Sequence, residues 1–350
     1  MNPTFGEFLR SMVENPSLLV TVILTLGVIL VNGWTDAPNA IATCISTRSM
    51  SPKAAIAMAS VFNLGGVVVM SIVSKQVAET IYTMVNFGGD ASQALVALCA
   101  AMVAIVVFAI AAWKFGIPTS ESHALIAGLS GAAIALQNGF SGINGSQWVK
   151  VLYGLVLSTL LGFGLGWLMA RLVNLLFRRA DRRKANSFFR GAQIFASAAM
   201  AFMHGAQDGL KFIGVFMLGI SLAGGHPLTA SLTIPVWLML LCSGVMALGT
   251  SIGGYRIIKA VGMDMVRLSR SQGFAADLAG AVCLLLASVT GLPVSTTHTK
   301  TTAIMGVGAE HRISSVNWNI VKEMLSAWVL TFPICGIIGY LMAKLFIAVF

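Results

Sequence analysis

The chain contains repeated apolar stretches that are long enough, as helices, to cross a membrane. A helix needs about 20 apolar residues to span roughly 30 Å of hydrocarbon. Eight such stretches recur, near residues 18–47, 52–73, 93–114, 148–177, 191–221, 231–254, 274–290 and 319–349. The alternation of apolar and polar residues that is typical of membrane β-strands is absent from the sequence. The sequence therefore predicts an all-α integral membrane protein.

The charged residues are few, and their positions carry an orientation signal. Only 10% of the residues are charged and 57% are apolar, whereas soluble chains carry roughly a quarter charged residues. Lysines and arginines gather in residues 178–190 and 256–270, and cytoplasmic loops of membrane proteins are rich in both. These loops are predicted to be cytoplasmic, in a multi-pass protein of the plasma membrane. No basic and aromatic stripe indicates binding to nucleic acid.

Two shorter apolar segments, near 117–137 and 292–309, are rich in Gly, Ser, Thr and His. We expect them to form re-entrant helical hairpins rather than simple spans. They also resemble each other at an offset of 175 residues, where they share Gly116/Gly291, Pro118/Pro293, Ser120/Ser295, His123/His298 and Gly131/Gly306. A second match, at an offset of 172, relates residues 32–43 to 204–215.

Two matches in the same order, at half the chain length, predict two repeats. The first would cover residues 1–177 and the second 191–350, joined by a basic cytoplasmic linker at 178–190. Each repeat contains an odd number of expected crossings, so the halves are predicted to have inverted topology. Inverted repeats with broken helices are typical of secondary transporters, whose site lies at the midplane between the repeats.

Asp36 and Asp208 are carboxylates at matching positions inside apolar stretches. Each costs roughly 2.5–3.5 kcal/mol to insert. Glycines near both and Pro38 after Asp36 predict broken helices, because proline removes a backbone donor. Freed carbonyls beside a carboxylate form a cation site. The predicted coupling-ion residues are Asp36, Asn39, Asp208 and Lys211, with sodium at Asp36, Asn39 and Asp208 as one form of the site. The alternative is a structural aspartate bonded to a neighbouring helix.

The repeated Pro-x-Ser-x-[Ser/Thr]-His element crowds hydroxyls into the start of each short segment. Proline suits the first helical position, and a half-helix N-terminus attracts anions through free N–H groups and the helix dipole. Two such ends facing each other would hold an oxyanion, with substrate-binding residues Thr119, Ser120, Ser122, Ser295, Thr296 and Thr297. The alternative is ordinary capping and helix-to-helix bonding. His123 and His298 are expected to be packing or hydrogen-bonding residues.

These paired motifs resemble those of the inorganic phosphate transporter (Pit) family, which includes the sodium–phosphate symporters. The family pattern has a G-x-N-D-x-x-N-A element and a P-x-S-x-[ST]-H element in each half, and the likeness spans roughly residues 25 to 310. The resemblance implies an inverted-repeat helical fold. It also implies oxyanion binding by the hydroxyls and amides of the short segments, and coupling-ion binding around the two aspartates.

Several residues depart from the family pattern. Thr35 and Gln207 stand where Asn is usual, and Lys211 takes the place that Asn39 holds in the first half. A lysine beside Asp208 supplies the positive charge that a sodium ion otherwise brings, which favours proton coupling or fewer sodium ions. Glu121 and Lys300 lie inside the two short segments. We expect them to meet as a gating or proton-linked pair, the alternative being a helix cap and a lysine that reaches water.

The expected function is uptake of inorganic phosphate by symport with a cation, a proton being favoured and sodium the alternative. No nucleotide-binding loop of the G-x-x-x-x-G-K-[ST] type is present, so the transporter is not a pump, and no enzyme activity or cofactor is expected. The expected partners are phosphate and the lipid bilayer, and a homo-oligomer is compatible with the sequence. Transport of another oxyanion such as sulfate, an anion channel and an intramembrane lipid-phosphate enzyme are the alternatives. Carriage of a metal–phosphate complex is left open.

Overall fold

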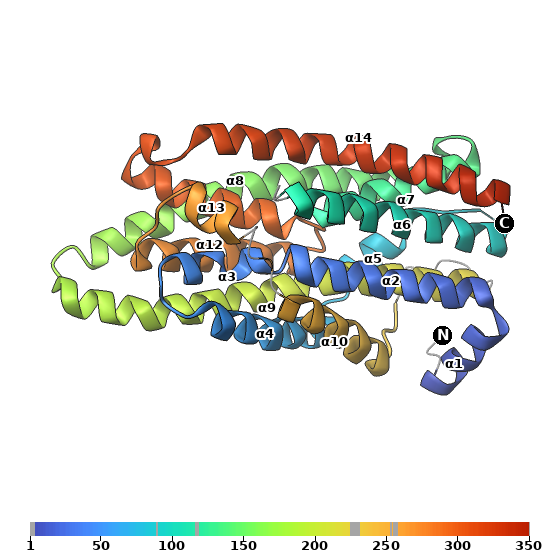
Figure 1. Cartoon of the computed structure of the whole chain (residues 1–350), viewed down its shortest axis with the longest axis horizontal. Helices are drawn as coiled ribbons and strands as arrows, with labels where there is room; N and C mark the ends of the chain where they lie inside the picture. Colours follow the sequence, from blue (N-terminus) through green and yellow to red (C-terminus); the bar gives the residue numbers. More distant parts are fainter. Residues whose placement is uncertain are drawn as a thin grey trace.

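The computed structural model describes residues 4–88, 90–115, 119–224, 232–252, 254 and 258–349, and no strand occurs among them (Figure 1). Long helices run side by side along the longest axis of the molecule. The turn between α8 and α9 lies at one end, and α1 and the C-terminus lie toward the other. The helices are α1 (Phe5–Glu14), α2 (Pro16–Thr35), α3 (Pro38–Ser46), α4 (Pro52–Val73), α5 (Gln76–Tyr82), α6 (Ala91–Phe115), α7 (Glu121–Gln137), α8 (Gly145–Leu176), α9 (Arg182–Ala223), α10 (Val236–Ile252), α12 (Arg270–Val289), α13 (Thr296–His311) and α14 (Trp318–Val349), with short turns η1 (Phe140–Gly142), η2 (Ala260–Asp264) and η3 (Ile313–Ser315).

The expected apolar stretches are confirmed as helices. Seven candidate spans are long and apolar enough to cross a membrane, α2 and α3 counting together as one. The remaining expected stretch, residues 231–254, contains α10, which is apolar but has only 17 residues. At 1.5 Å per residue the 42 residues of α9 extend about 63 Å, roughly twice the hydrocarbon thickness. The first turns of α9 therefore take up most of the basic segment 178–190, which is largely helix rather than a loop.

Each short segment contributes one helix, α7 or α13, that begins after extended residues. The caps are the repeated serines: Ser120 Oγ accepts from the backbone N–H of His123, and Ser295 Oγ from that of His298, both at 3.2 Å. A side-chain oxygen that accepts from the third residue satisfies a donor that the helix leaves unpaired. Pro293 lies two residues before its cap rather than in the first turn. Pro118 lies outside the described residues.

Glycines shared by the two halves make matching helix contacts. A Cβ at Gly131 of α7 would collide with the backbone of α14, and one at Gly306 of α13 with the backbone of α8. Likewise Gly33 of α2 faces the backbone of α10, and Gly205 of α9 that of α4. Small residues let helix backbones approach closely within a membrane. These matched contacts support the expectation of two repeats, while their inverted orientation and the domain boundaries stay predictions.

Candidate functional site

The first aspartate lies where α2 ends and α3 begins. Residues 36 and 37 separate the two helices, and Pro38 opens α3, where its missing N–H removes no hydrogen bond. The Asp36 side chain is turned into the protein and is 2% exposed. The break that the sequence predicts at this position is therefore present.

The second aspartate lies inside an unbroken helix, and the break expected there is wrong. Asp208 lies within α9, which is continuous from Arg182 to Ala223. The glycines around it serve helix packing instead: a Cβ at Gly205 would strike the backbone of Asn63, and one at Gly209 the side chain of Val67. These glycines let α4 approach α9, so the backbone near Asp208 frees no carbonyls for a cation.

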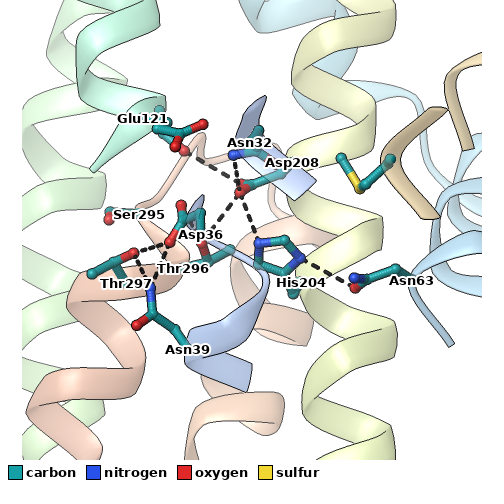
Figure 2. A network of polar contacts seen from close by, with 12 residues as sticks. Asn32, Asp36, Asn39, Asn63, Glu121, His204, Asp208, Ser295, Thr296 and Thr297 are labelled. Carbon is teal, nitrogen blue, oxygen red and sulfur yellow. Dashed lines mark hydrogen bonds and ion pairs between the residues drawn. The ribbon is translucent and has the colours of Figure 1, made fainter. Parts of the chain in front are cut away.

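A threonine of α13 bridges the two aspartates (Figure 2). The Thr296 hydroxyl lies 3.3 Å from Asp36 Oδ2 and 3.2 Å from Asp208 Oδ2. Its neighbour Thr297 donates to Asp36 Oδ1. The first turn of α13 therefore brings together two carboxylates that are 172 residues apart in the sequence.

Asn39 presents its amide nitrogen, not its oxygen, to the first aspartate. Its Nδ2 donates to Asp36 Oδ1 at 2.8 Å and to Thr297 Oγ1 at 2.9 Å. A cation at the predicted coupling-ion residue Asn39 would need the amide oxygen, so this arrangement of the side chain does not present a cation ligand. A half-turn of the amide about its last side-chain bond exchanges the two atoms, and it would make Asn39 an oxygen ligand next to Asp36.

Asp208 is held by a lysine, a histidine and an asparagine. Lys211 Nζ lies 2.7 Å from Asp208 Oδ1, and His204 Nε2 lies 3.3 Å from Oδ2. Asn32 Nδ2 donates to the same Oδ2 at 3.3 Å. The other ring nitrogen of His204 lies 3.1 Å from Asn63 Oδ1, which orients the imidazole (Figure 2).

Lys211 also ties α9 to both short segments. Its ammonium donates to the Ser122 hydroxyl at 2.6 Å and to the backbone oxygen of Val294 at 2.5 Å. Ser122 in turn donates to Asp208 Oδ1 at 3.3 Å. The side chain is fully buried, so it neutralises Asp208 and joins the start of α7 to the residues that precede α13.

The predicted substrate residues gather at the starts of α7 and α13. Ser120 and Ser295 are buried caps, and Thr119 is half-buried in the extended residues before α7. Ser122 reaches Asp208, while Thr296 and Thr297 reach Asp36. The hydroxyls and carboxylates that we assigned to separate anion and cation sites thus form one continuous cluster, which we call the central cluster: Asp36, Ser122, Asp208, Thr296 and Thr297.

The expected pair of Glu121 and Lys300 does not form in this structure. Glu121 accepts a hydrogen bond from Thr35 at the end of α2. Lys300 forms an ion pair with Asp277 of α12, one helical turn further along α13 than the site threonines. Lys300 therefore faces a carboxylate that the sequence had not singled out, and Glu121 remains at the central cluster.

His123 and His298 meet at the contact between α7 and α13. Their ring centroids lie 4.6 Å apart, Phe332 of α14 stacks on His123 at 4.7 Å, and Trp328 stacks on His298 at 3.7 Å. Both imidazoles are fully buried. These aromatic contacts agree with the packing role expected for the two histidines.

His204, Asn32 and Asn63 contribute to the site although no function was predicted for them from the sequence. His204 and Asn32 stand at equivalent positions of the 172-residue match, and both contact Asp208. Polar residues one turn before each intramembrane aspartate were the available signal. Asn63 lies on α4 with no counterpart in the matched motifs, so only the fold identifies it.

The arrangement offers ligands for a small cation. Asp36, His204 and Asp208 each present one ligand atom, and these three atoms lie within 4.8 Å of one another. Hydroxyl oxygens of Thr296 and Thr297 adjoin them. Carboxylate and hydroxyl oxygens suit a hard cation such as sodium, whereas the imidazole suits a proton or a transition metal equally well.

Comparisons with known proteins agree on one family. A model of the phosphate transporter family matches residues 32–339. The probable low-affinity inorganic phosphate transporter of Bacillus subtilis (strain 168) is 38% identical over 324 residues, covering 92% of this chain and 94% of its own. The probable low-affinity inorganic phosphate transporter of Rhizobium meliloti (strain 1021) is 36% identical over 326 residues, which cover 93% of this chain and 95% of that protein. A solved structure titled the sodium-dependent phosphate transporter shares the fold, with a TM-score of 0.88, 22% identity, and 96% of this chain and 100% of that chain covered.

Proposed function

Because the chain belongs to the phosphate transporter family, we propose that it takes up inorganic phosphate by secondary active symport with a cation. The observation that carries the proposal is the cross-connection at the centre. Asp36 of the first half contacts the start of α13 in the second, and Asp208 of the second half contacts Ser122 of α7 in the first. A rearrangement of either short helix must therefore change the surroundings of a carboxylate in the opposite half.

The anion is assigned to the space between the starts of α7 and α13. Ser120 and Ser295 cap these helices, whose N-terminal dipoles favour negative charge. The hydroxyls of Thr296 and Thr297 donate to carboxylates in this structure, so they are donors of the kind that phosphate oxygens accept. In this proposal phosphate takes over some of these donors when it binds.

The coupling cation is assigned to the carboxylates that have no ammonium partner. Among the described residues the buried acids are Asp36, Glu121, Asp208 and Asp277, and the buried lysines are Lys211 and Lys300. Both lysines pair, with Asp208 and Asp277, while Asp36 and Glu121 form no ion pair with lysine or arginine in that part of the chain. A buried charge without a partner is costly, so these two groups are the places for a proton or a sodium ion.

Proton coupling is favoured over two symmetric sodium ions. Lys211 stands three residues after Asp208, as Asn39 stands after Asp36, and its ammonium lies where a second cation would compensate Asp208. Uptake of an anion against a negative interior is opposed by about 2.3 kcal/mol per charge per 100 mV. Co-transported positive charge offsets that opposition, and Asp36 and Glu121 are the groups that would take it up and release it.

Uptake of labelled phosphate into proteoliposomes tests the proposal. Proton and sodium gradients are imposed separately, and labelled sulfate serves as the matched anion. We expect phosphate to accumulate under an inward proton gradient, and sulfate not to do so. Accumulation of both anions to equal levels, or phosphate flux without any dependence on either gradient, would contradict the proposed function.

A further inference from the structure

A second buried polar cluster surrounds Asp277 of α12, away from the central one. Its members come from four helices, and each is fully buried. They are Thr43 of α3, Gln193 and Ser197 of α9, Asp277 of α12 and Lys300 of α13. The central cluster uses none of these five side chains, so the role of the second cluster is separate.

Four donors converge on the carboxylate of Asp277. Thr43 Oγ1 donates to Oδ1 at 2.6 Å, and Gln193 Nε2 donates to Oδ2 at 2.6 Å. Ser197 also donates to Oδ2, and Lys300 forms an ion pair with Oδ1. One ammonium, two hydroxyls and one amide form the donor set that a tetrahedral oxyanion takes in a protein. The carboxylate therefore occupies a site whose chemistry suits an anion.

The donors are fixed by close helix packing. Gly273 and Gly280 lie four residues before and three residues after Asp277, hence on the same face of α12. A Cβ at Gly273 would come within 2.7 Å of Gln193 Oε1, and one at Gly280 within 3.0 Å of Met200 Sδ. A side chain at Gly273 would displace the end of Gln193, and one at Gly280 would crowd Met200, so the two glycines leave room for these α9 side chains beside the carboxylate.

The second cluster lies on the way from the central cluster to the basic end of the molecule. On α3, Thr43 follows Asn39 by one turn, and on α13, Lys300 follows Thr297 by nearly one turn. On α9, Ser197 precedes His204 by seven residues, or about 10 Å. All three displacements run toward the turn between α8 and α9 (Figure 1). That turn carries the basic residues that are predicted to be cytoplasmic.

The ion pair of the second cluster is not repeated at the matching positions of the first half. At the offset of 175 the counterparts of Asp277 and Lys300 are Met102 and Leu125, and at 172 the counterpart of Thr43 is Val215. All three counterparts are apolar and buried. The ammonium and the carboxylate of the second cluster therefore have apolar counterparts at the positions that the repeat relates to them.

We propose that the second cluster is a relay site for phosphate between the central site and the basic end, in which the Asp277 carboxylate holds the place of the anion. During passage the phosphate displaces the carboxylate and is received by Lys300, Thr43, Gln193 and Ser197. The proposal rests on the proposed function, because it takes phosphate to be the transported anion. It adds a second binding site and assigns Lys300 to it.

Binding of radiolabelled phosphate to the purified full-length chain, by equilibrium dialysis at saturating phosphate, tests the relay site. Asp277→Ala removes the resident carboxylate and leaves all four donors. We expect this variant to bind one more phosphate per chain than the unaltered protein. The double variant Asp277→Ala/Lys300→Gln lacks the ammonium and should lose that extra phosphate. Glu14→Ala, which removes a carboxylate that is 70% exposed, should change nothing.

The outcomes separate this inference from the proposed function. An unaltered chain that binds no phosphate contradicts the proposed function. An unaltered chain and a folded Asp277→Ala variant that bind equal amounts overturn the relay site alone, and the cluster is then a structural ion pair. If Asp277→Ala does not fold, Asp277→Ser gives the same comparison, because its short side chain also leaves the place of the carboxylate empty while it offers a hydroxyl to the buried donors. As a second readout, Lys300→Gln should lower the maximal uptake rate at least ten-fold with an unchanged half-saturating phosphate concentration, and an unchanged rate overturns the proposal.

Discussion

Replacing Lys211 with asparagine should convert the second aspartate into a sodium site. The substitution gives Asp208 the same Asp-x-x-Asn spacing that Asp36 and Asn39 have in the first half. Lys211 is fully buried, and its ammonium contacts Asp208 at 2.7 Å, Ser122 at 2.6 Å and Val294 O at 2.5 Å. The substitution therefore removes a cation from the centre of the molecule without adding volume.

The expected cost follows from the loss of that cation. Removing one partner of a buried ion pair typically destabilises a protein by about 3–5 kcal/mol, and the asparagine amide returns only about 1 kcal/mol as a hydrogen bond. A bound cation would offset much of the remainder. Sodium at a hundred times its dissociation constant contributes about 2.7 kcal/mol to stability. The variant should thus be unstable without sodium and nearly restored by it.

The assay is thermal unfolding of the purified chain in sodium chloride and in choline chloride at equal ionic strength. Lys211→Asn should unfold at a clearly lower temperature in choline than in sodium, whereas the unaltered chain should show a much smaller difference. The double variant Asp208→Asn/Lys211→Asn lacks the carboxylate as well and should not respond to sodium. A single variant that is as stable as the unaltered chain in choline, or that ignores sodium, would refute the view that Lys211 stands in for a cation.

Three further tests use substitutions in other parts of the site and the fold. Ser120→Ala or Ser295→Ala removes a donor to a charged group, worth roughly 1.5–3 kcal/mol, so apparent phosphate affinity should fall about ten- to a hundred-fold in uptake titrations; unchanged affinity in both excludes these serines from the site. Asp36→Asn should abolish uptake against a gradient in a protein that still inserts, and continued accumulation would refute the cation assignment. Gly205→Ala should lower the unfolding temperature, because its Cβ would meet the α4 backbone, whereas Gly164→Ala, with nothing within 4 Å, should not.

Hydropathy and the matched motifs predicted the architecture because they are local properties of the sequence. The apolar stretches are helices in the structure, and the helix break predicted from Pro38 lies beside Asp36. The repeated serines became caps of α7 and α13, since a side chain that accepts from the third residue needs only local backbone geometry. These features depend on neighbours within one turn, which a sequence displays directly.

Features that depend on contacts between distant helices were not predictable in the same way. From the sequence alone, the glycines near Asp208 are equally compatible with a broken helix and with close packing of two helices. In the structure they face α4, so they serve close packing. The predicted partner of Lys300, Glu121, was wrong. The actual partner, Asp277, has an apolar counterpart in the first half, Met102. Comparison of the repeats therefore could not reveal it. The available signal was simpler: Asp277 is a carboxylate inside an apolar stretch, where any charge is costly.

The most direct test of the central claim is an experimentally determined structure of the full chain with phosphate bound. We expect the anion between the starts of α7 and α13, within hydrogen-bonding distance of donors from both short segments, with Ser120 and Ser295 on opposite sides of it and Asp36 in the adjoining shell of contacts. Phosphate that contacts only one half of the molecule, or that binds away from both helix starts, would contradict the claim that the two halves hold the anion jointly.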